Sequence, residues 1–130
     1  MANRVFLNPD GYIEVVLDGK QSYMTIDNMK YTIQDLINQL EQQGKPRLGL
    51  VDLTTDETYS PDSNKAAMQT LESLNYEKIA MFGAGEVLTE VTKAIILAIG
   101  RSHNTKIFKS REEAVKWLLE GNNQANTDQK

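Results

Sequence analysis

Apolar residues recur along this chain with two different periods. Short runs rich in β-branched and aromatic residues are typical of strands, and they occupy 4–7, 12–17, 48–53, 78–82 and 106–108. Between and after them, apolar residues spaced three and four apart predict amphipathic helices, at about 29–43, 61–74, 86–100 and from 111. The predicted order is β-β-α-β-α-β-α-β-α. Strands that alternate with helices pair in parallel, so this order indicates an α/β fold with a mostly parallel sheet.

The first two strands are joined by a strong turn signal, Asn8-Pro9-Asp10-Gly11. Proline presets the second position of such a turn, and glycine supplies the positive φ that follows. We therefore expect an N-terminal antiparallel hairpin at the edge of a mixed sheet, with the helices packed mainly on one face. Alternation along the second strand predicts two faces. One carries Ile13, Val15 and Leu17, and the other carries Tyr12, Glu14 and Val16.

The helix boundaries are predicted by capping residues. The start of the first helix stays open between an early cap at Thr25 or Asp27 and a late cap at Thr32, and Gly44 ends it. Ser60-Pro61 opens the second helix, with serine as the N-cap and proline at the first helical position.

The last helix is predicted to open at Ser110 with a capping box and to stop at Gly121. The residues after it carry no apolar side chain larger than alanine, which predicts disorder. The expected organisation is one domain over residues 1–120 and a disordered tail over 121–130.

The third helix shows an unusual distribution of apolar residues. Its buried face is predicted to consist of Val87, Val91, Ala94, Ile95 and Ala98. Ile96 and Leu97 then fall on the otherwise polar side. Two interpretations stay open: these residues contact a partner or a second copy of the chain, or a loop of the same domain covers them.

Composition narrows the classes of function. A net charge of −4 argues against a nucleic-acid partner, and the absence of cysteine excludes disulfides and thiolate metal sites. The longest apolar run, 94–99, is far shorter than the roughly 20 residues of a membrane span. The N-terminus lacks the apolar segment of a signal peptide, so we expect a cytoplasmic protein. With a single histidine, no nucleophile–base pair can be assembled, and no cofactor or metal is expected.

Three stretches carry a resemblance to a known family: LVDLT at 50–54, KIAMFG at 78–83 and KIFKSREEAVKWL at 106–118. With the order of elements, they resemble the STAS domain of sporulation anti-anti-sigma factors. The closer resemblance is to the bacterial SpoIIAA-like, STAS/Sec14-type single-domain proteins. The resemblance covers nearly the whole chain apart from the tail.

The resemblance implies a regulatory role. In the anti-anti-sigma members a serine after an aspartate, at the start of the helix that follows the central strand, accepts a phosphate. Asp62-Ser63 occupies that place here, although the family's following Ser-Gly is replaced by Asn64-Lys65. The acids and hydroxyls that precede it form a candidate partner-binding surface, made of Asp52, Thr54, Asp56, Glu57, Tyr59 and Asp62. The alternative interpretation of Ser63 is an ordinary first-turn residue of a helix.

Two functions follow from these observations. The first is a non-enzymatic regulatory or protein-interaction module, whose partner is a kinase, another regulator or a second copy of the chain. The second is a carrier of a small apolar ligand or lipid, suggested by the Sec14-like relatives. Methionines adapt to irregular ligands but also fill cores, and the relevant ones are Met24, Met29, Met68 and Met81.

Overall fold

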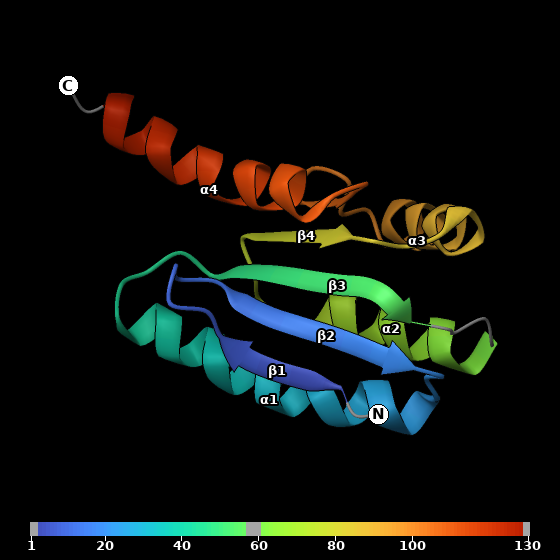
Figure 1. The fold of residues 1–130 in the computed structure, drawn as a ribbon. Coiled ribbons are helices and arrows are strands. Elements are labelled where there is room, and N and C mark those ends of the chain that lie inside the picture. The colour runs from blue at the N-terminus through green and yellow to red at the C-terminus, as the bar shows by residue number, and fades with distance from the viewer. Residues whose placement is uncertain (1–2, 57–60, 129–130) are drawn as a thin grey trace.

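A five-stranded sheet runs through the middle of the protein, and helices cover both of its faces (Figure 1). The computed structural model describes residues 3–56 and 61–128, with side chains described as far as residue 120. The strands are β1 (Arg4–Leu7), β2 (Ile13–Gly19), β3 (Leu48–Asp56), β4 (Lys78–Phe82) and β5 (Thr105–Phe108). The helices are α1 (Tyr23–Gln42), α2 (Pro61–Ser73), α3 (Glu86–Ala98) and α4 (Arg111–Asp128).

The strands lie in the sheet in the order in which they occur along the chain, β1-β2-β3-β4-β5. Only the β1–β2 pair is antiparallel, and the other neighbours are parallel. Parallel connections cross over with a right hand, so an order without reversal places successive crossover helices on the same face. The predicted mixed sheet, its N-terminal hairpin and the placement of most helices on one face are confirmed.

Two apolar clusters fill the space on either side of the sheet. Helices α1, α2 and α3 pack on one face, which we call the α1–α3 face, over residues such as Ile13, Val15 and Ile79. Helix α4 packs on the other face, which we call the α4 face, over Leu50, Ala80 and their neighbours. The predicted alternation in β2 is confirmed, because the Ile13 side of this strand belongs to the first cluster and the Tyr12 side to the second.

Helix α1 begins earlier than its apolar pattern indicates. Its N-cap is Ser22, whose hydroxyl accepts a hydrogen bond from Thr25 N at 3.2 Å, while Ser22 N donates to Thr25 Oγ1 at 2.9 Å. None of the predicted starts is therefore the cap, although Thr25 is the third residue of this capping box. The end is as predicted: Gly44 follows the helix with a φ of 68°, which glycine adopts at little cost.

The predicted buried face of α3 is largely wrong, although Ile95 is partly buried and packs against the first cluster as predicted. Leu88, Thr92 and Ile96 are the buried residues of this helix, whereas Val87 is 62% exposed and Leu97 is 73% exposed. Apolar residues surround most of the circumference of α3, so spacing alone does not determine which stripe faces the protein. Packing against α2 and β5 selects the stripe that contains Ile96.

Helix α4 opens as predicted, with Glu113 N donating to Ser110 Oγ at 3.2 Å. Its predicted end at Gly121 is wrong, because the helix continues to Asp128 through most of the segment expected to be disordered. A single glycine costs about 1 kcal/mol in a helix relative to alanine, which does not by itself terminate one.

Candidate functional site

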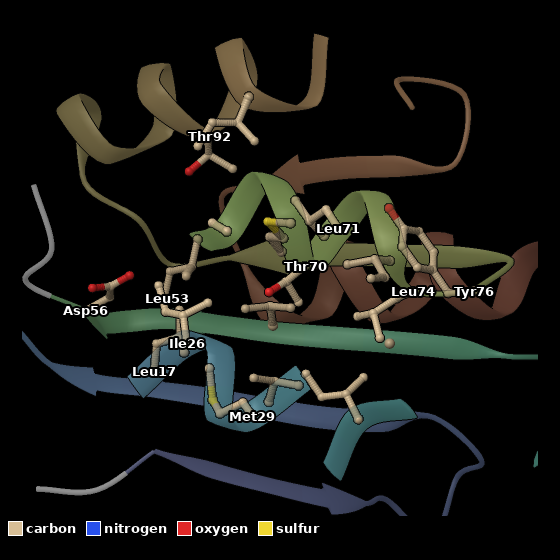
Figure 2. Close-up of a pocket in the computed structure, with 18 of the residues that line it drawn as sticks. Leu17, Ile26, Met29, Leu53, Asp56, Thr70, Leu71, Leu74, Tyr76 and Thr92 are labelled. Atoms are coloured by element: carbon tan, nitrogen blue, oxygen red, sulfur yellow. The ribbon is translucent and has the colours of Figure 1, made fainter. Parts of the chain in front are cut away.

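On the α1–α3 face, a partly open cavity of about 120 Å³ lies between the sheet and the three helices (Figure 2). Protein interiors rarely contain voids much larger than a water molecule. An engineered cavity of about 150 Å³ in another protein stays dry and binds benzene. The cavity found here is thus of the size that accepts a small apolar group.

Small side chains leave this space open. Gly49 of β3 and Ala67 of α2 both line the cavity, at places where a larger residue would fill it. A Cβ atom at Gly49 would lie 3.3 Å from Ile79 Cγ1, so a side chain there would require Ile79 to move by a few tenths of an ångström. Parallel α/β sheets commonly bind ligands in a crevice at the carboxyl ends of the strands, where the strand order reverses. This strand order has no reversal and so no such crevice, which leaves the cavity beneath the helices as the candidate binding site.

The cavity wall is mainly aliphatic, with polar groups at a few places. Met29 and Met81 belong to it, whereas Met68 does not line it and Met24 is 65% exposed. Tyr76 also lines it, but its hydroxyl is hydrogen-bonded to Thr105 Oγ1 at 2.7 Å. The remaining polar lining residues are Asp56, Ser63, Asn64, Thr70 and Thr92. Within residues 3–56 and 61–128, no lysine or arginine lines the cavity.

Ser63 lies in the first turn of α2, as predicted, but its side chain faces inward. It is 1% exposed and lines the cavity. The inward position shows that Ser63 belongs to the packed side of α2, whereas the neighbouring Asp62 is exposed. A kinase could reach the Ser63 hydroxyl only if the start of α2 moved.

The residues predicted to form one acidic surface lie on different sides of the sheet. Asp52 accepts a hydrogen bond from Thr54 N at 2.9 Å within β3, where the register between β2 and β3 shifts, and the turn that the sequence suggests does not follow. Its register partner Phe82 belongs to the α4 face, so Asp52 points to that side. Asp56 instead lines the cavity. Glu57 and Tyr59, like the predicted N-cap Ser60, lie outside the described residues.

The end of β3 lies close to the end of β4. Thr54 is exposed, and its backbone passes next to Gly83, which has a φ of 88°. A Cβ atom at Gly83 would collide with Thr54 Oγ1 and lie 3.0 Å from Thr54 N. Gly83 therefore serves a close approach of two strands at this edge of the sheet.

The two α3 residues considered for a partner contact differ in exposure. Ile96 is 5% exposed and packs inside this chain, which favours the second interpretation, cover by the same domain. Leu97 is 73% exposed and remains available to a partner. Rotation of the helix by one residue relative to the predicted face produces this difference.

An ion pair joins the hairpin to α4 on the α4 face. Arg111 donates to both carboxylate oxygens of Glu14, from Nη2 to Oε1 at 2.7 Å and from Nη1 to Oε2 at 2.9 Å. Asn8 Nδ2 also donates to Glu14 Oε1 at 3.0 Å. The Arg111 hydrogen bonds lower the pKa of Glu14 although burial acts in the opposite direction. Because Arg111 and Asn8 pair both oxygens of its carboxylate, we interpret Glu14 as a structural residue.

Other kinds of site find no support in the described part of the chain. Among residues 3–56 and 61–128, no group of three or more histidine, cysteine or acidic residues could hold a metal ion. Within the same residues, no helix combines the length and apolar character that crossing a membrane requires.

A small α/β domain with a cavity between its sheet and three crossover helices is the class that fold and site define. The chain matches the SpoIIAA-like family over residues 12–119 and belongs to it. No curated protein matches the chain with significant similarity.

Two solved structures share the fold. An uncharacterized DUF3478-family protein with a SpoIIAA-like fold, from Shewanella loihica PV-4, is 19% identical with a TM-score of 0.59, over 90% of this chain and 92% of that one. The anti-sigma factor antagonist SpoIIAA in its unphosphorylated form is 10% identical with a TM-score of 0.60, over 92% of this chain and 99% of that one. At these identities the likeness concerns the fold.

The sequence interpretation did not identify the threonines of the cavity. The signal that could have revealed them is a shared spacing of four, Ala66–Thr70–Leu74 after β3 and Leu88–Thr92–Ile96 after β4. In each triplet a threonine stands between two apolar residues on the buried stripe.

Proposed function

We propose that this chain is a non-catalytic binding protein, acting in the cytoplasm, whose cavity holds a small apolar ligand. The cavity of about 120 Å³ on the α1–α3 face is the observation that carries the proposal. Its aliphatic wall suits an apolar ligand, because binding would remove apolar surface of the ligand from water. Membership of the SpoIIAA-like family is compatible with this function.

A cavity-filling variant tests the proposal. Ala67→Leu places a larger side chain at a lining position, and Ala94→Leu makes the same change at an exposed position of α3 as a matched control. Methyl NMR shifts of the lining residues Ile33 and Leu53 report binding of benzene as the probe. We expect benzene to bind the wild type and Ala94→Leu alike, and Ala67→Leu at least about tenfold more weakly, from a loss of about 1.4 kcal/mol.

Failure of benzene to shift these signals in the wild type would overturn the proposal, as would equal binding by Ala67→Leu. Native mass spectrometry of the protein purified from its own host supplies a second readout. A co-purifying small apolar molecule that is displaced by benzene would support the proposal.

A second function, regulation through a protein partner, is favoured by the fold shared with the anti-sigma factor antagonist SpoIIAA. We propose that the partner binds a surface formed by the carboxyl end of β3 and the first turn of α2. Its residues are Asp52, Thr54, Asp56, Glu57, Tyr59 and Asp62. Leu97 is a further proposed contact for a partner or a second copy of the chain. Ser63 is the proposed phosphoacceptor, accessible after α2's first turn opens. A phosphate there would meet the positive end of the helix dipole.

Asp62→Asn tests this second function, with Asp35→Asn in α1 as an exposed acidic control. If the surface binds a kinase or regulator, Asp62→Asn reduces recovery of that protein from host extract and Asp35→Asn does not. Intact mass before and after phosphatase treatment, repeated with Ser63→Ala, reports modification. Unchanged partner recovery with Asp62→Asn and no phosphatase-sensitive mass would contradict this function.

A further inference from the structure

Two threonine hydroxyls of the cavity wall are open to the cavity and form no hydrogen bond with the described part of the protein. Thr70 is 8% exposed and Thr92 is 7% exposed, and both side chains line the cavity. They come from different helices, α2 and α3. Among the described residues, neither Thr70 Oγ1 nor Thr92 Oγ1 forms a hydrogen bond, whereas Thr89 Oγ1 on α3 donates to Ala84 O at 3.2 Å.

Threonine hydroxyls in helices often bond to the carbonyl of the preceding turn. Thr70 and Thr92 do not take this option, and both are directed toward the space between the helices and β3 (Figure 2). In the described part of the chain no fully buried side-chain oxygen lacks a partner, so these two hydroxyl oxygens are accessible from the cavity and are satisfied only by what occupies it. Two such groups facing one cavity indicate that they bind something inside it.

We infer that the ligand of this cavity is a neutral molecule with a small apolar body and one oxygen group, which Thr70 and Thr92 hold by hydrogen bonds. This inference rests on the proposed ligand-binding function and specifies its ligand class. A short alcohol, a phenol or a ketone of about the size of one ring has this chemistry.

The charges around the cavity support a neutral ligand. Among the described residues that line it there is no lysine or arginine to supply a positive charge. A carboxylate ligand would therefore lose its hydration without gaining a counter-charge. A hydroxyl, in contrast, can donate to one threonine and accept from the other, since each threonine hydroxyl does both.

Three one-ring probes separate these chemistries: benzene, phenol and benzoate. The proteins compared are the wild type and the double variant Thr70→Val/Thr92→Val, in which valine keeps the shape of threonine without the hydroxyl. We expect the wild type to bind phenol about fivefold more tightly than benzene, the typical effect of a net hydrogen bond, and to show no binding of benzoate. The double variant should bind benzene at least as well as the wild type and lose the preference for phenol.

Thermal unfolding without ligand serves as the folding control. Because the hydroxyls have no partner in the protein, the double variant should unfold at or above the wild-type temperature. Thr89→Val, which removes a hydroxyl that does have a partner, is the matched comparison and should unfold at a lower temperature.

The outcomes distinguish the two proposals. If benzene binds the wild type but phenol binds no better, or the phenol preference survives in the double variant, the inference about the hydroxyls is overturned and the apolar site stands. Binding of benzoate would overturn the requirement for a neutral ligand. If no probe binds, both proposals fall together with the cavity as a binding site.

Discussion

The two faces of the sheet differ in how completely their polar and apolar groups are matched. On the α4 face, Leu118 and Ala114 are fully buried against β3 and β4, and the buried Glu14 is paired twice with Arg111. On the α1–α3 face, three helices leave a cavity, and two threonine hydroxyls face it without a partner among the described residues.

This difference teaches where stability and binding reside. Close packing and a satisfied ion pair make the α4 face a stabilising region. The α1–α3 face gives up part of its packing and leaves two hydroxyls open to its cavity, and proteins retain such losses of packing where a site needs them. Substitutions on the two faces should therefore have different effects.

The largest expected effect is a loss of stability from Leu118→Ala. This side chain is fully buried on the α4 face, and we expect its truncation to cost about 4 kcal/mol in the free energy of unfolding. Leu71→Ala on the cavity wall should cost about 2 kcal/mol, because a side chain beside a void already lacks contacts on one side. Urea unfolding measures both. Equal losses would show that the two faces are packed equally well.

Gly83→Ala should have the next largest effect, a loss of about 3 kcal/mol in the free energy of unfolding. The positive φ disfavours alanine, and its Cβ atom would collide with Thr54. Gly85→Ala is the matched control, because a Cβ atom there meets nothing within 4 Å and the change should stay within about 1 kcal/mol. Similar stability of the two variants in urea would contradict the close approach of β3 and β4.

Arg111→Met should cost about 2 kcal/mol at pH 7, since it leaves the buried Glu14 carboxylate with fewer donors. The folded state lowers the pKa of Glu14, so the stabilisation is complete above the ordinary glutamate pKa of about 4.3 and is lost as the pH falls through the lower folded value. The difference in the free energy of unfolding between wild type and Arg111→Met should thus become smaller below about pH 4.3.

Unfolding curves from pH 7 to pH 3 test this dependence. Lys109→Met removes an exposed charge near the same end of the sheet and should change stability by less than about 0.5 kcal/mol. A gap between wild type and Arg111→Met that stays constant over this pH range would mean that Glu14 is not the group involved.

The smallest expected effect is a gain. Ala67→Leu should raise the free energy of unfolding by about 0.5–1 kcal/mol, because it fills the cavity, while Ala94→Leu should change it little. A clear loss of stability in Ala67→Leu would mean that the space beside α2 is too narrow for the added side chain.

Local signals in the sequence predicted most of the architecture. Asn8-Pro9-Asp10-Gly11 predicted the hairpin, and alternation in β2 predicted its two faces, because turn geometry and strand period depend on neighbouring residues alone. Boundaries were harder to predict. Ser22 was missed as a cap, since the first turn of α1 carries few apolar residues, and Gly121 was given more weight than one glycine has.

The candidate site was less predictable than the fold. Ser63 and Asp56 were selected for chemistry on a surface, and the structure places both on the wall of a cavity. The two threonines were not selected, because a threonine on a helix shows its function only when the groups around it are known. Hydrogen-bond partners of a side chain come from distant elements, which a single sequence does not align.

By itself, therefore, the sequence determined the order of the elements, the hairpin, the parallel pairing and the family resemblance, all of which follow from period, turn chemistry and short motifs. Only the tertiary structure decided which stripe of α3 is buried, that Ser63 faces inward, and that a cavity with two unpartnered hydroxyls lies beneath three helices. The physical reason is that rotation of a helix about its axis and the volume left between helices depend on packing between residues far apart in the chain.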